Sequence, residues 1–176
     1  MQADGDVAGM LHRLVRDIND YPQPGVVFKD ITPLLADARA LAATVQALAS
    51  GHEPVDKVAG IEARGFILAA PVAYLLGVGF VPVRKQGKLP GPTHAQTYQL
   101  EYGTSAVEVH VDAFQPGDRV LMIDDVLATG GTSAATAALI RRCDAEVTAL
   151  GVLIELGFLG GRAALPGIDI RALLAL

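Results

Sequence analysis

Two adjacent carboxylates followed by an uncharged loop are the residues of this sequence best suited to chemistry. Asp124 and Asp125 come directly after the apolar run 120–123, and a loop of glycine and threonine follows them. Ionised carboxylates accept hydrogen bonds from hydroxyl groups, so the pair suits a neutral diol such as that of a ribose. The same pair would repel a triphosphate. The alternative is that both aspartates only form a turn.

The loop behind the aspartates has the composition of a site for one phosphate group. Ala128, Thr129, Gly130 and Gly131 lead into a helix predicted to begin at Thr132. Free N–H groups and the positive end of the helix dipole meet at such a point, and hydroxyl groups add further donors. No lysine follows the glycines, so this is not a Walker loop. The stretch predicts a site for a ribose 5-phosphate, unless Thr132 is only an ordinary N-cap.

A guanidinium is expected close to this site. Arg64 lies in a short polar loop behind the predicted strand 55–61. Its planar fork of N–H donors fits the paired oxygens of a phosphate. The alternative is a turn arginine that pairs with Glu62, since exposed ion pairs of this kind are common.

A basic segment follows the next predicted strand. Arg84, Lys85 and Lys88 place three positive charges within five residues, among glycines and prolines. Taken alone, such a segment is best explained as a solvated loop. Beside a phosphate site it is a candidate lid that closes over pyrophosphate and excludes water.

The apolar spacing predicts a chain in which strands and helices alternate. Alternation of this kind indicates an α/β domain whose central, mostly parallel sheet is flanked by helices on both faces. In such sheets ligands bind beyond the carboxyl ends of the strands, which would bring the three loops together. The expected elements are a helix from 7 to near 19, an extended piece at 26–28, a helix at 37–50 capped by Asp37, a strand at 55–61, a helix at 66–76, strands at 79–84 and 119–123, a helix at 132–142, a strand at 146–155 and a short helix and last strand in 157–176.

The remaining pattern predicts one domain over 1–176. A less regular insertion at 85–115 contains a half-exposed antiparallel strand around Val107, Val109 and Val111. The uncharged stretch 66–83 is divided by prolines and glycines, which favours a helix and a buried strand over a membrane span.

Composition narrows the class of protein. The chain has 176 residues, is 51% hydrophobic and carries a formal net charge of -5. An acidic chain of this kind argues against a nucleic-acid partner, which needs clustered Lys and Arg. Cys143 is the single cysteine, so no intrachain disulfide can form, and the N-terminus lacks the positive charge of a secretory leader. A cytoplasmic protein without a membrane partner is expected.

The stretch 120–132 resembles the phosphoribosyl-pyrophosphate (PRPP) binding signature of type I phosphoribosyltransferases. The similarity reaches the members of that family that act on adenine, through matching segments in the same order at 21–25, 28–35, 60–66, 84–91, 100–103 and 154–156. The resemblance implies the type I phosphoribosyltransferase fold, with a small base-binding hood at about 1–35 and a flexible catalytic loop at about 85–106. It also implies purine salvage, in which adenine and PRPP give AMP and pyrophosphate with Mg²⁺, and a homodimer.

The same resemblance implies roles for individual residues. Arg64 falls at the pyrophosphate-loop position and counts among the catalytic residues, with Glu101 and Tyr102. Glu101 would interact with the purine N7 proton and Tyr102 would pack over the site. The basic segment would bind pyrophosphate, and the base would lie against Phe28 with its edge read around Val26, Val27, Phe28 and Lys29.

One residue departs from the family pattern. Relatives commonly carry arginine where this chain has Lys29. Lysine keeps the positive charge but lacks the planar fork of donors. A bidentate contact at this position is therefore not expected.

Two other functions compete with this one. A regulator could keep the fold to sense PRPP while binding DNA or RNA, although the acidic chain and the lack of an added helix-turn-helix argue against it. An enzyme of the same family could act on hypoxanthine or guanine. A pocket that binds the adenine amine would leave a polar group unpaired against a 6-oxo base, so competition between purines distinguishes the two enzymes.

Overall fold

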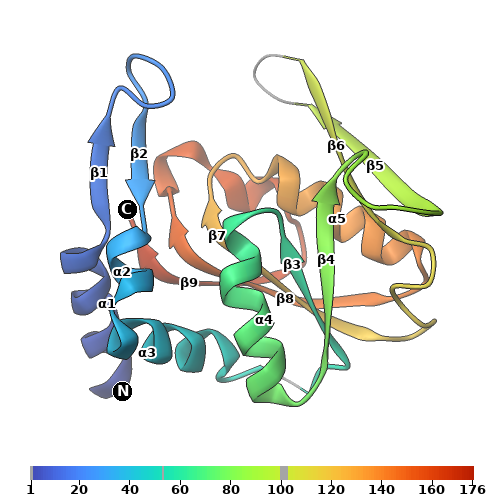
Figure 1. The fold of residues 1–176 in the computed structure, drawn as a ribbon, viewed down its shortest axis with the longest axis horizontal. Coiled ribbons are helices and arrows are strands. Elements are labelled where there is room, and N and C mark those ends of the chain that lie inside the picture. Colours follow the sequence, from blue (N-terminus) through green and yellow to red (C-terminus); the bar gives the residue numbers. More distant parts are fainter. Residues whose placement is uncertain (1, 53, 100–102) are drawn as a thin grey trace. The chain divides into compact units, whose positions relative to one another are not determined.

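The structure is a computed structural model that describes residues 2–52, 54–99 and 103–176. It contains two compact units, Met1–Ala47 and Leu48–Leu176. Figure 1 shows the helices and strands of each unit. The organisation of the chain as a single domain stays a prediction.

The first unit contains a β-hairpin between helices. Its elements are α1 (Gln2–Leu14), β1 (Arg16–Asn19), β2 (Val27–Asp30), α2 (Thr32–Ala36) and the greater part of α3 (Ala38–Ala49). The prediction of one helix to near Asn19 is wrong, because the helix ends at Leu14. Ile18 fits the helical spacing, but in the structure it pairs with Phe28 in an antiparallel ladder. Tertiary pairing therefore overrides the local pattern.

The start of α3 follows the predicted capping. Asp37 Oδ1 accepts hydrogen bonds from the N–H groups of Arg39 and Ala40, each at 2.9 Å. These are two of the donors that the first turn of a helix leaves without a main-chain partner. The N-cap is confirmed, whereas the short α2 before it was not expected.

The second unit is built on a seven-stranded sheet, in the order β5-β6-β4-β3-β7-β8-β9. Neighbours from β4 to β9 run parallel, while β6 pairs antiparallel with β4 and β5. The predicted mostly parallel sheet is confirmed. The strands are β3 (Lys57–Ile61), β4 (Gly79–Lys85), β5 (Thr93–Gln99), β6 (Thr104–His110), β7 (Arg119–Leu127), β8 (Glu146–Glu155) and β9 (Asp169–Ala175).

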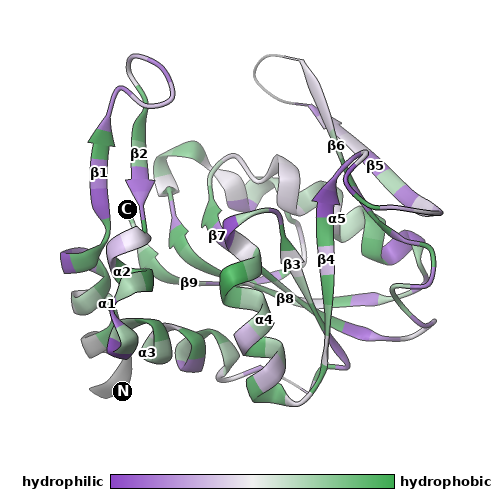
Figure 2. Ribbon diagram, viewed as in Figure 1, coloured by the Kyte–Doolittle hydropathy of each residue, from purple (hydrophilic) through white to green (hydrophobic). Residues whose placement is uncertain are grey.

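Helices α4 (Arg64–Leu76) and α5 (Gly131–Arg142) cover opposite faces of this sheet. Ala59 of β3 belongs to the buried cluster that contains Leu139 and Ile140 of α5. The next residue, Gly60, faces α4 so closely that a Cβ there would lie 2.6 Å from Ala69 Cβ. Successive strand residues point to opposite faces, so each face has its own helix. Figure 2 shows hydrophobic residues along α4 and the middle of β4.

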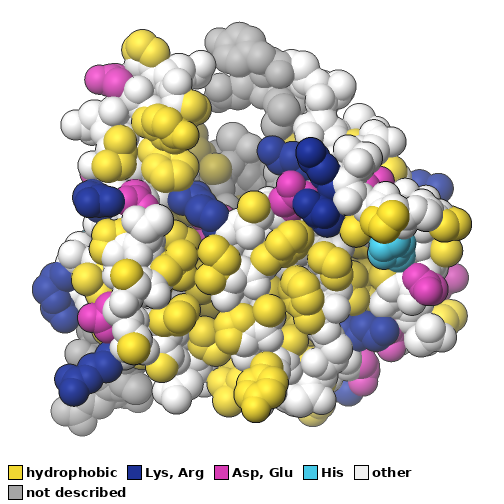
Figure 3. Space-filling view, viewed as in Figure 1, with side chains coloured by type: hydrophobic (Ala, Val, Ile, Leu, Met, Phe, Trp, Pro, Cys, Tyr) yellow, Lys and Arg dark blue, Asp and Glu magenta, His cyan; other side chains and the backbone are white. Residues whose placement is uncertain are grey.

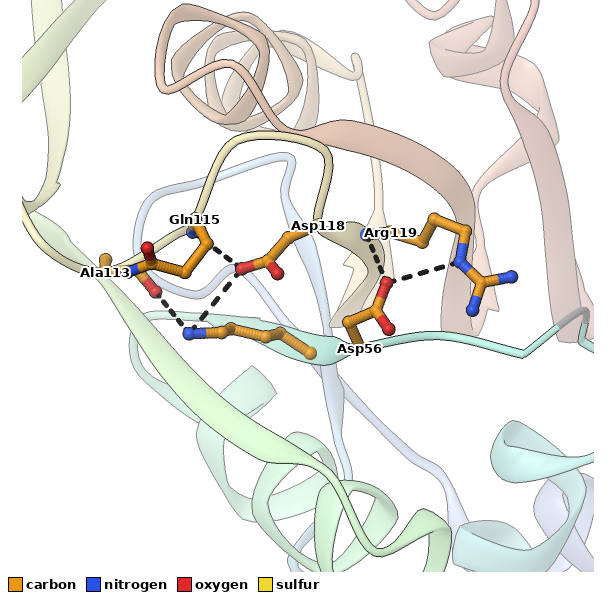
Figure 4. Close-up of polar contacts among 6 residues, drawn as sticks. Asp56, Ala113, Gln115, Asp118 and Arg119 are labelled. Atoms are coloured by element: carbon orange, nitrogen blue, oxygen red, sulfur yellow. Dashed lines mark hydrogen bonds and ion pairs between the residues drawn. The ribbon is translucent and has the colours of Figure 1, made fainter.

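Ion pairs join the sheet strands at their amino ends (Figure 4). Asp56 Oδ2 accepts hydrogen bonds from the main-chain N–H of Arg119 at 2.8 Å and from its Nε at 3.3 Å. Lys57 donates to the carbonyl of Ala113 at 3.1 Å and lies 3.6 Å from Asp118 Oδ2. These contacts tie the start of β3 to the turn before β7, at the end of the sheet away from the loops considered below.

The long uncharged stretch divides as predicted into α4 and β4. None of the helices in the described ranges has the length and hydrophobicity to cross a membrane.

Candidate active site

Three loops meet at one edge of the sheet. Strands β4, β3 and β7 are neighbours and parallel, so their carboxyl ends lie side by side. At or just beyond these ends lie Arg64, which begins α4, the basic turn 84–89 and the phosphate loop 128–132. Figure 2 shows β4 changing from hydrophobic to hydrophilic at this end. The structure thus brings together the predicted residues of the sugar-phosphate and pyrophosphate sites.

The two aspartates belong to strand β7. The strand continues to Leu127, and Asp124 and Asp125 are each only 8% exposed. The alternative in which they form a turn is therefore wrong. The main-chain N–H of Asp125 donates to Asp124 Oδ1 at 2.8 Å. Burial, followed by the negative charge of Asp125, raises the pKa of Asp124 well above its ordinary value.

Arg64 is joined to this pair. Its Nη2 lies 2.6 Å from Asp125 Oδ2. The contact requires α4 to begin close to β7, and Gly65 permits it, since a Cβ there would lie 3.0 Å from Asp124 Oδ1 and 3.1 Å from the carbonyl oxygen of Ile123. Glu62, which could have paired with Arg64, forms its ion pair with Arg84. A guanidinium and two carboxylates therefore converge at the end of β7.

The phosphate loop leaves the first turn of α5 open. The N-cap is Gly130, with φ of +82°, and its side-chain position offers no hydrogen bond to the helix. The first main-chain bond of the helix runs from Ala134 N–H to the Gly130 carbonyl at 2.8 Å. The alternative in which Thr132 is the N-cap is wrong, because Thr132 lies inside the helix. The N–H groups of the first turn are thus available to an anion.

A short segment supports the phosphate loop from behind. It consists of η1 (Gly157–Leu159) and η2 (Gly161–Ala164). Gly130 packs directly against the carbonyl of Gly161, with no room for a side chain. Arg162 holds the segment by donating from Nε and Nη2 to the two oxygens of Glu155, each at 2.7 Å, and from Nη1 to the Ile170 carbonyl at 3.1 Å. The loop therefore rests on a fixed surface.

The basic turn is folded around Glu62. Glu62 Oε2 accepts a hydrogen bond from Arg84 Nε at 3.1 Å and another from the main-chain N–H of Lys85 at 3.0 Å. Arg84 Nη1 donates to the carbonyl of Lys88 at 3.0 Å. Figure 3 shows Lys and Arg side chains gathered next to acidic ones over the end of β4. Lys85 and Lys88 are exposed, so both residues are open to solvent at this end of β4.

The antiparallel hairpin β5–β6 ends beside the start of α5. A Cβ on Gly131 would lie 3.5 Å from the Gln99 carbonyl oxygen and 3.5 Å from Tyr98 Cδ2. Half of the flexible loop expected at 85–106 is strand in this structure, namely 85, 93–99 and 104–106, and whether the loop moves stays a prediction. Glu101 and Tyr102 lie outside the described residues.

The predicted base-binding residues lie in and next to the hairpin of the first unit. The rings of Phe28 and Tyr21 meet edge to face, with centroids 5.2 Å apart and an angle of 76°. Val26 N–H donates to the Gln23 carbonyl at 3.2 Å, and Val27 is 45% exposed. Lys29 Nζ donates to Asp17 Oδ1 at 2.7 Å, so the lysine at the family's arginine position forms an ion pair within the hairpin.

Comparisons with known proteins agree with this arrangement. The phosphoribosyl transferase domain family matches residues 28–160. A protein of Acidothermus cellulolyticus named adenine phosphoribosyltransferase is 60% identical over 171 residues, which are 96% of this chain and 97% of that protein. The crystal structure of adenine phosphoribosyltransferase from Rhodothermus marinus superimposes with a TM-score of 0.93 at 47% identity, covering 98% of this chain and 99% of that one.

A ligand-bound structure is also similar. Adenine phosphoribosyltransferase from Saccharomyces cerevisiae, complexed with an imino-altritol bisphosphate and adenine, has a TM-score of 0.89 at 32% identity. The match covers 97% of this chain and 99% of the yeast chain. The α/β fold with a mostly parallel sheet and flanking helices is therefore that of known phosphoribosyltransferases.

Proposed function

This chain belongs to the phosphoribosyl transferase domain family, and on that premise we propose that it is an adenine phosphoribosyltransferase of purine salvage. It would join adenine to PRPP and release AMP and pyrophosphate. One observation carries the proposal: the buried pair Asp124 and Asp125 lies near the end of β7, and the loop that follows the strand leads into the uncapped start of α5. The carboxylates can accept from the hydroxyls of a ribose, and the start of the helix can bind its 5-phosphate.

The ribose 5-phosphate would bind at the end of β7. Asp124 and Asp125 would accept hydrogen bonds from the two ribose hydroxyls. The phosphate loop, comprising Ala128, Thr129, Gly130, Gly131 and Thr132, would surround the phosphate with N–H and hydroxyl donors. The contacts of Gly130 with the segment behind it support a loop that is preorganised before the substrate arrives.

The pyrophosphate would leave toward the basic residues. Four cations lie at the carboxyl ends of the neighbouring strands β3 and β4, and each can donate to phosphate oxygens: Arg64, Arg84, Lys85 and Lys88. Cleavage at the anomeric carbon places negative charge on the leaving pyrophosphate, so these cations stabilise the transition state more than the bound substrate. Arg64 would keep its contact with Asp125 and so link the sugar to the leaving group.

The family resemblance assigns adenine binding to Phe28 and its neighbours, and it assigns further roles to Glu101 and Tyr102. Phe28 would stack on the base, and the main chain around Val26, Val27 and Lys29 would bind its edge. Glu101 would interact with the N7 proton while Tyr102 packs over the site. These roles come from the family resemblance, and substitution of each residue tests them.

Magnesium would enter with PRPP. In the described part of the chain, no group of three or more His, Cys, Asp or Glu side chains is placed to hold a metal ion. Mg²⁺ is commonly held by one or two carboxylates together with substrate phosphates and water, which fits the carboxylates at the end of β7. When bound, the ion would neutralise charge on the pyrophosphate. Removing Mg²⁺ with a chelator should abolish turnover.

A homodimer in the cytoplasm completes the proposal. Helix α4 leaves large apolar side chains exposed, with Ile67 at 46%, Tyr74 at 90% and Leu75 at 52%. Figure 3 shows this side as a broad hydrophobic area. An exposed apolar area of this kind commonly marks a protein interface. Sedimentation analysis of the wild type and of Tyr74→Glu tests it, since the variant should sediment as a monomer.

The test of the reaction is direct. The purified protein with adenine, PRPP and Mg²⁺ should produce AMP and pyrophosphate in equal amounts. Folded protein that yields no AMP would rule the proposal out. Hypoxanthine and guanine, added in excess, should compete poorly with adenine, because a 6-oxo group cannot replace the donor of the adenine amine.

A further inference from the structure

Glu108 is a buried carboxylate with no role in the proposed reaction. It lies on β6 between the buried Val107 and Val109, and it is itself only 3% exposed. In the sheet it stands opposite Arg84 of β4. Burying a carboxylate is unfavourable unless hydrogen bonds replace its water, so its partners show what the side chain holds.

Those partners belong to the segment between β4 and β5. Glu108 Oε1 accepts hydrogen bonds from the main-chain N–H groups of Lys88 at 2.9 Å and Leu89 at 2.8 Å. Glu108 Oε2 accepts one from the hydroxyl of Thr93 at 3.2 Å. Burial raises the pKa of Glu108, but hydrogen bonds from Leu89, Gly87, Lys88 and Thr93 outweigh this, and the pKa lies below its ordinary value. The carboxylate is thus ionised, and both of its oxygens are hydrogen-bonded.

Lys88 is held at both of its main-chain polar groups. Its N–H donates to Glu108 Oε1 at 2.9 Å and also to the carbonyl of Lys85 at 3.2 Å, and its own carbonyl accepts from Arg84 Nη1 at 3.0 Å. Arg84 is itself fixed by Glu62. The side chains of Glu108 on β6 and Arg84 on β4, together with the turn bond to Lys85, therefore set the orientation of the Lys88 main chain. This orientation fixes the direction in which the exposed lysine side chain leaves.

We propose that Glu108 is a positioning residue for PRPP, which fixes the main chain of Lys88 so that its ammonium group meets the pyrophosphate. This inference rests on the proposed function, since it assumes that the basic turn receives pyrophosphate. Glu108 touches no substrate. It orders the turn before PRPP binds. The entropy cost of fixing Lys88 therefore does not weaken the binding of PRPP.

The role depends on an acceptor at the right place rather than on negative charge. Glutamine in place of Glu108 keeps one carbonyl oxygen that can accept from both Lys88 and Leu89, while Thr93 can rotate its hydroxyl to accept from the amide. Aspartate keeps the charge but is one methylene shorter and cannot reach both N–H groups. The two variants therefore separate position from charge.

Steady-state kinetics of Glu108→Gln and Glu108→Asp provide the test. Glu108→Asp should raise KM for PRPP about tenfold, the effect of losing one charge-assisted hydrogen bond, with KM for adenine unchanged. Glu108→Gln should stay within about threefold of the wild type, given the retained acceptor. Glu146→Gln, at the exposed start of β8, is the matched control and should change neither constant.

Amide hydrogen exchange without any ligand gives a second readout. Exchange at Lys88 and Leu89 should speed up in Glu108→Asp and stay slow in Glu108→Gln, while exchange in β8 stays slow in both. A folded Glu108→Asp variant with wild-type KM for PRPP would overturn the inference. The inference would also be overturned if amide exchange in this variant became faster throughout the protein rather than only at the turn. If the wild type makes no AMP, the proposed function fails, whereas the exchange result still reports on the positioning of Lys88.

Discussion

The guanidinium of Arg64 lies 2.6 Å from the carboxylate of Asp125, across the gap between the start of α4 and the end of β7. The pair links two of the three loops that form the candidate site. Asp125 is buried and Arg64 is partly exposed, so the arginine neutralises a carboxylate that would otherwise be costly to bury. It also keeps a guanidinium in place beside the position proposed for the leaving group.

Replacing Arg64 by lysine should impair PRPP use while the protein stays folded. Lysine keeps the charge but cannot contact Asp125 and a phosphate with one rigid fork. The expected loss in kcat/KM for PRPP is about tenfold, equivalent to one charge-assisted hydrogen bond. Arg141→Lys, on the exposed end of α5, is the control and should be neutral. Equal values of kcat/KM for PRPP in the two variants would show that Arg64 does not bind pyrophosphate.

Asp124→Asn should make the protein more stable and less active. The raised pKa means that, between the pKa of the unfolded chain and that of the native protein, the native state retains a proton that the unfolded state has lost. The stability therefore falls as pH rises through this window. Removing the ionisable group should raise the free energy of unfolding at neutral pH by about 1 kcal/mol.

The measurement is urea unfolding at acidic and neutral pH, alongside KM for PRPP. The wild type should lose stability as pH rises through the window, and Asp124→Asn should lose less. KM for PRPP should rise, because an amide is a weaker acceptor for a ribose hydroxyl than a carboxylate. Asp112→Asn, on an exposed turn, serves as the control. A variant that is less stable than the wild type at neutral pH would contradict this account.

Gly130→Ala should destabilise the protein by more than the cost of placing alanine in a left-handed backbone conformation, and it should disrupt the phosphate loop. Gly130 and Gly117 have nearly equal φ, +82° and +84°, but only Gly130 is enclosed, with Ala164 Cβ 2.9 Å from the position of a new Cβ. Gly117→Ala should cost about 1 kcal/mol of unfolding free energy, from the left-handed backbone alone. Gly130→Ala should cost about 3 kcal/mol, since a clash is added.

Kinetics complete that comparison. KM for PRPP should rise in Gly130→Ala and stay unchanged in Gly117→Ala, whose turn lies before β7 at the other end of the sheet. If the free energy of unfolding fell equally in both alanine variants, the close packing of Gly130 on Gly161 would not contribute to the effect.

Lys57→Met should lower stability without changing catalysis. The substitution removes the hydrogen bond to Ala113 and the ion pair with Asp118 shown in Figure 4. The expected loss is about 1 kcal/mol of unfolding free energy, typical of one hydrogen bond of a half-buried side chain. Thermal unfolding and an AMP assay of the same preparation check it. A change in KM for PRPP would contradict the prediction and would show that the amino end of the sheet is energetically coupled to the site.

Much of the fold follows from patterns that are local in the sequence. Strand β8 has the predicted bounds, and α5 differs from the prediction by one residue. The spacing of apolar residues within each segment determines such elements, because each strand or helix buries one apolar face in the same layered core. Strand β1 was missed for the opposite reason, since its pairing with β2 depends on residues eight to fourteen positions away in the chain.

The site was predictable in its residue types and less so in its contacts. Asp124 and Asp125 were recognisable because two carboxylates before a loop of glycine and threonine offer hydroxyl acceptors next to a phosphate cradle. Glu108 gave no such signal, because a glutamate between valines is typical of a strand with a solvated face. Its burial depends on the turn at Lys88 and Leu89 folding back over it, which no local pattern encodes.

The carboxylates behind the basic turn bear on how the enzyme releases its product. Glu62 and Glu108 offset two of the three positive charges of Arg84, Lys85 and Lys88. A turn with all three charges uncompensated would hold pyrophosphate tightly after the reaction as well as before it. Because strong binding of a product slows each catalytic cycle, we expect the local charge balance to favour repeated turnover over retention of pyrophosphate.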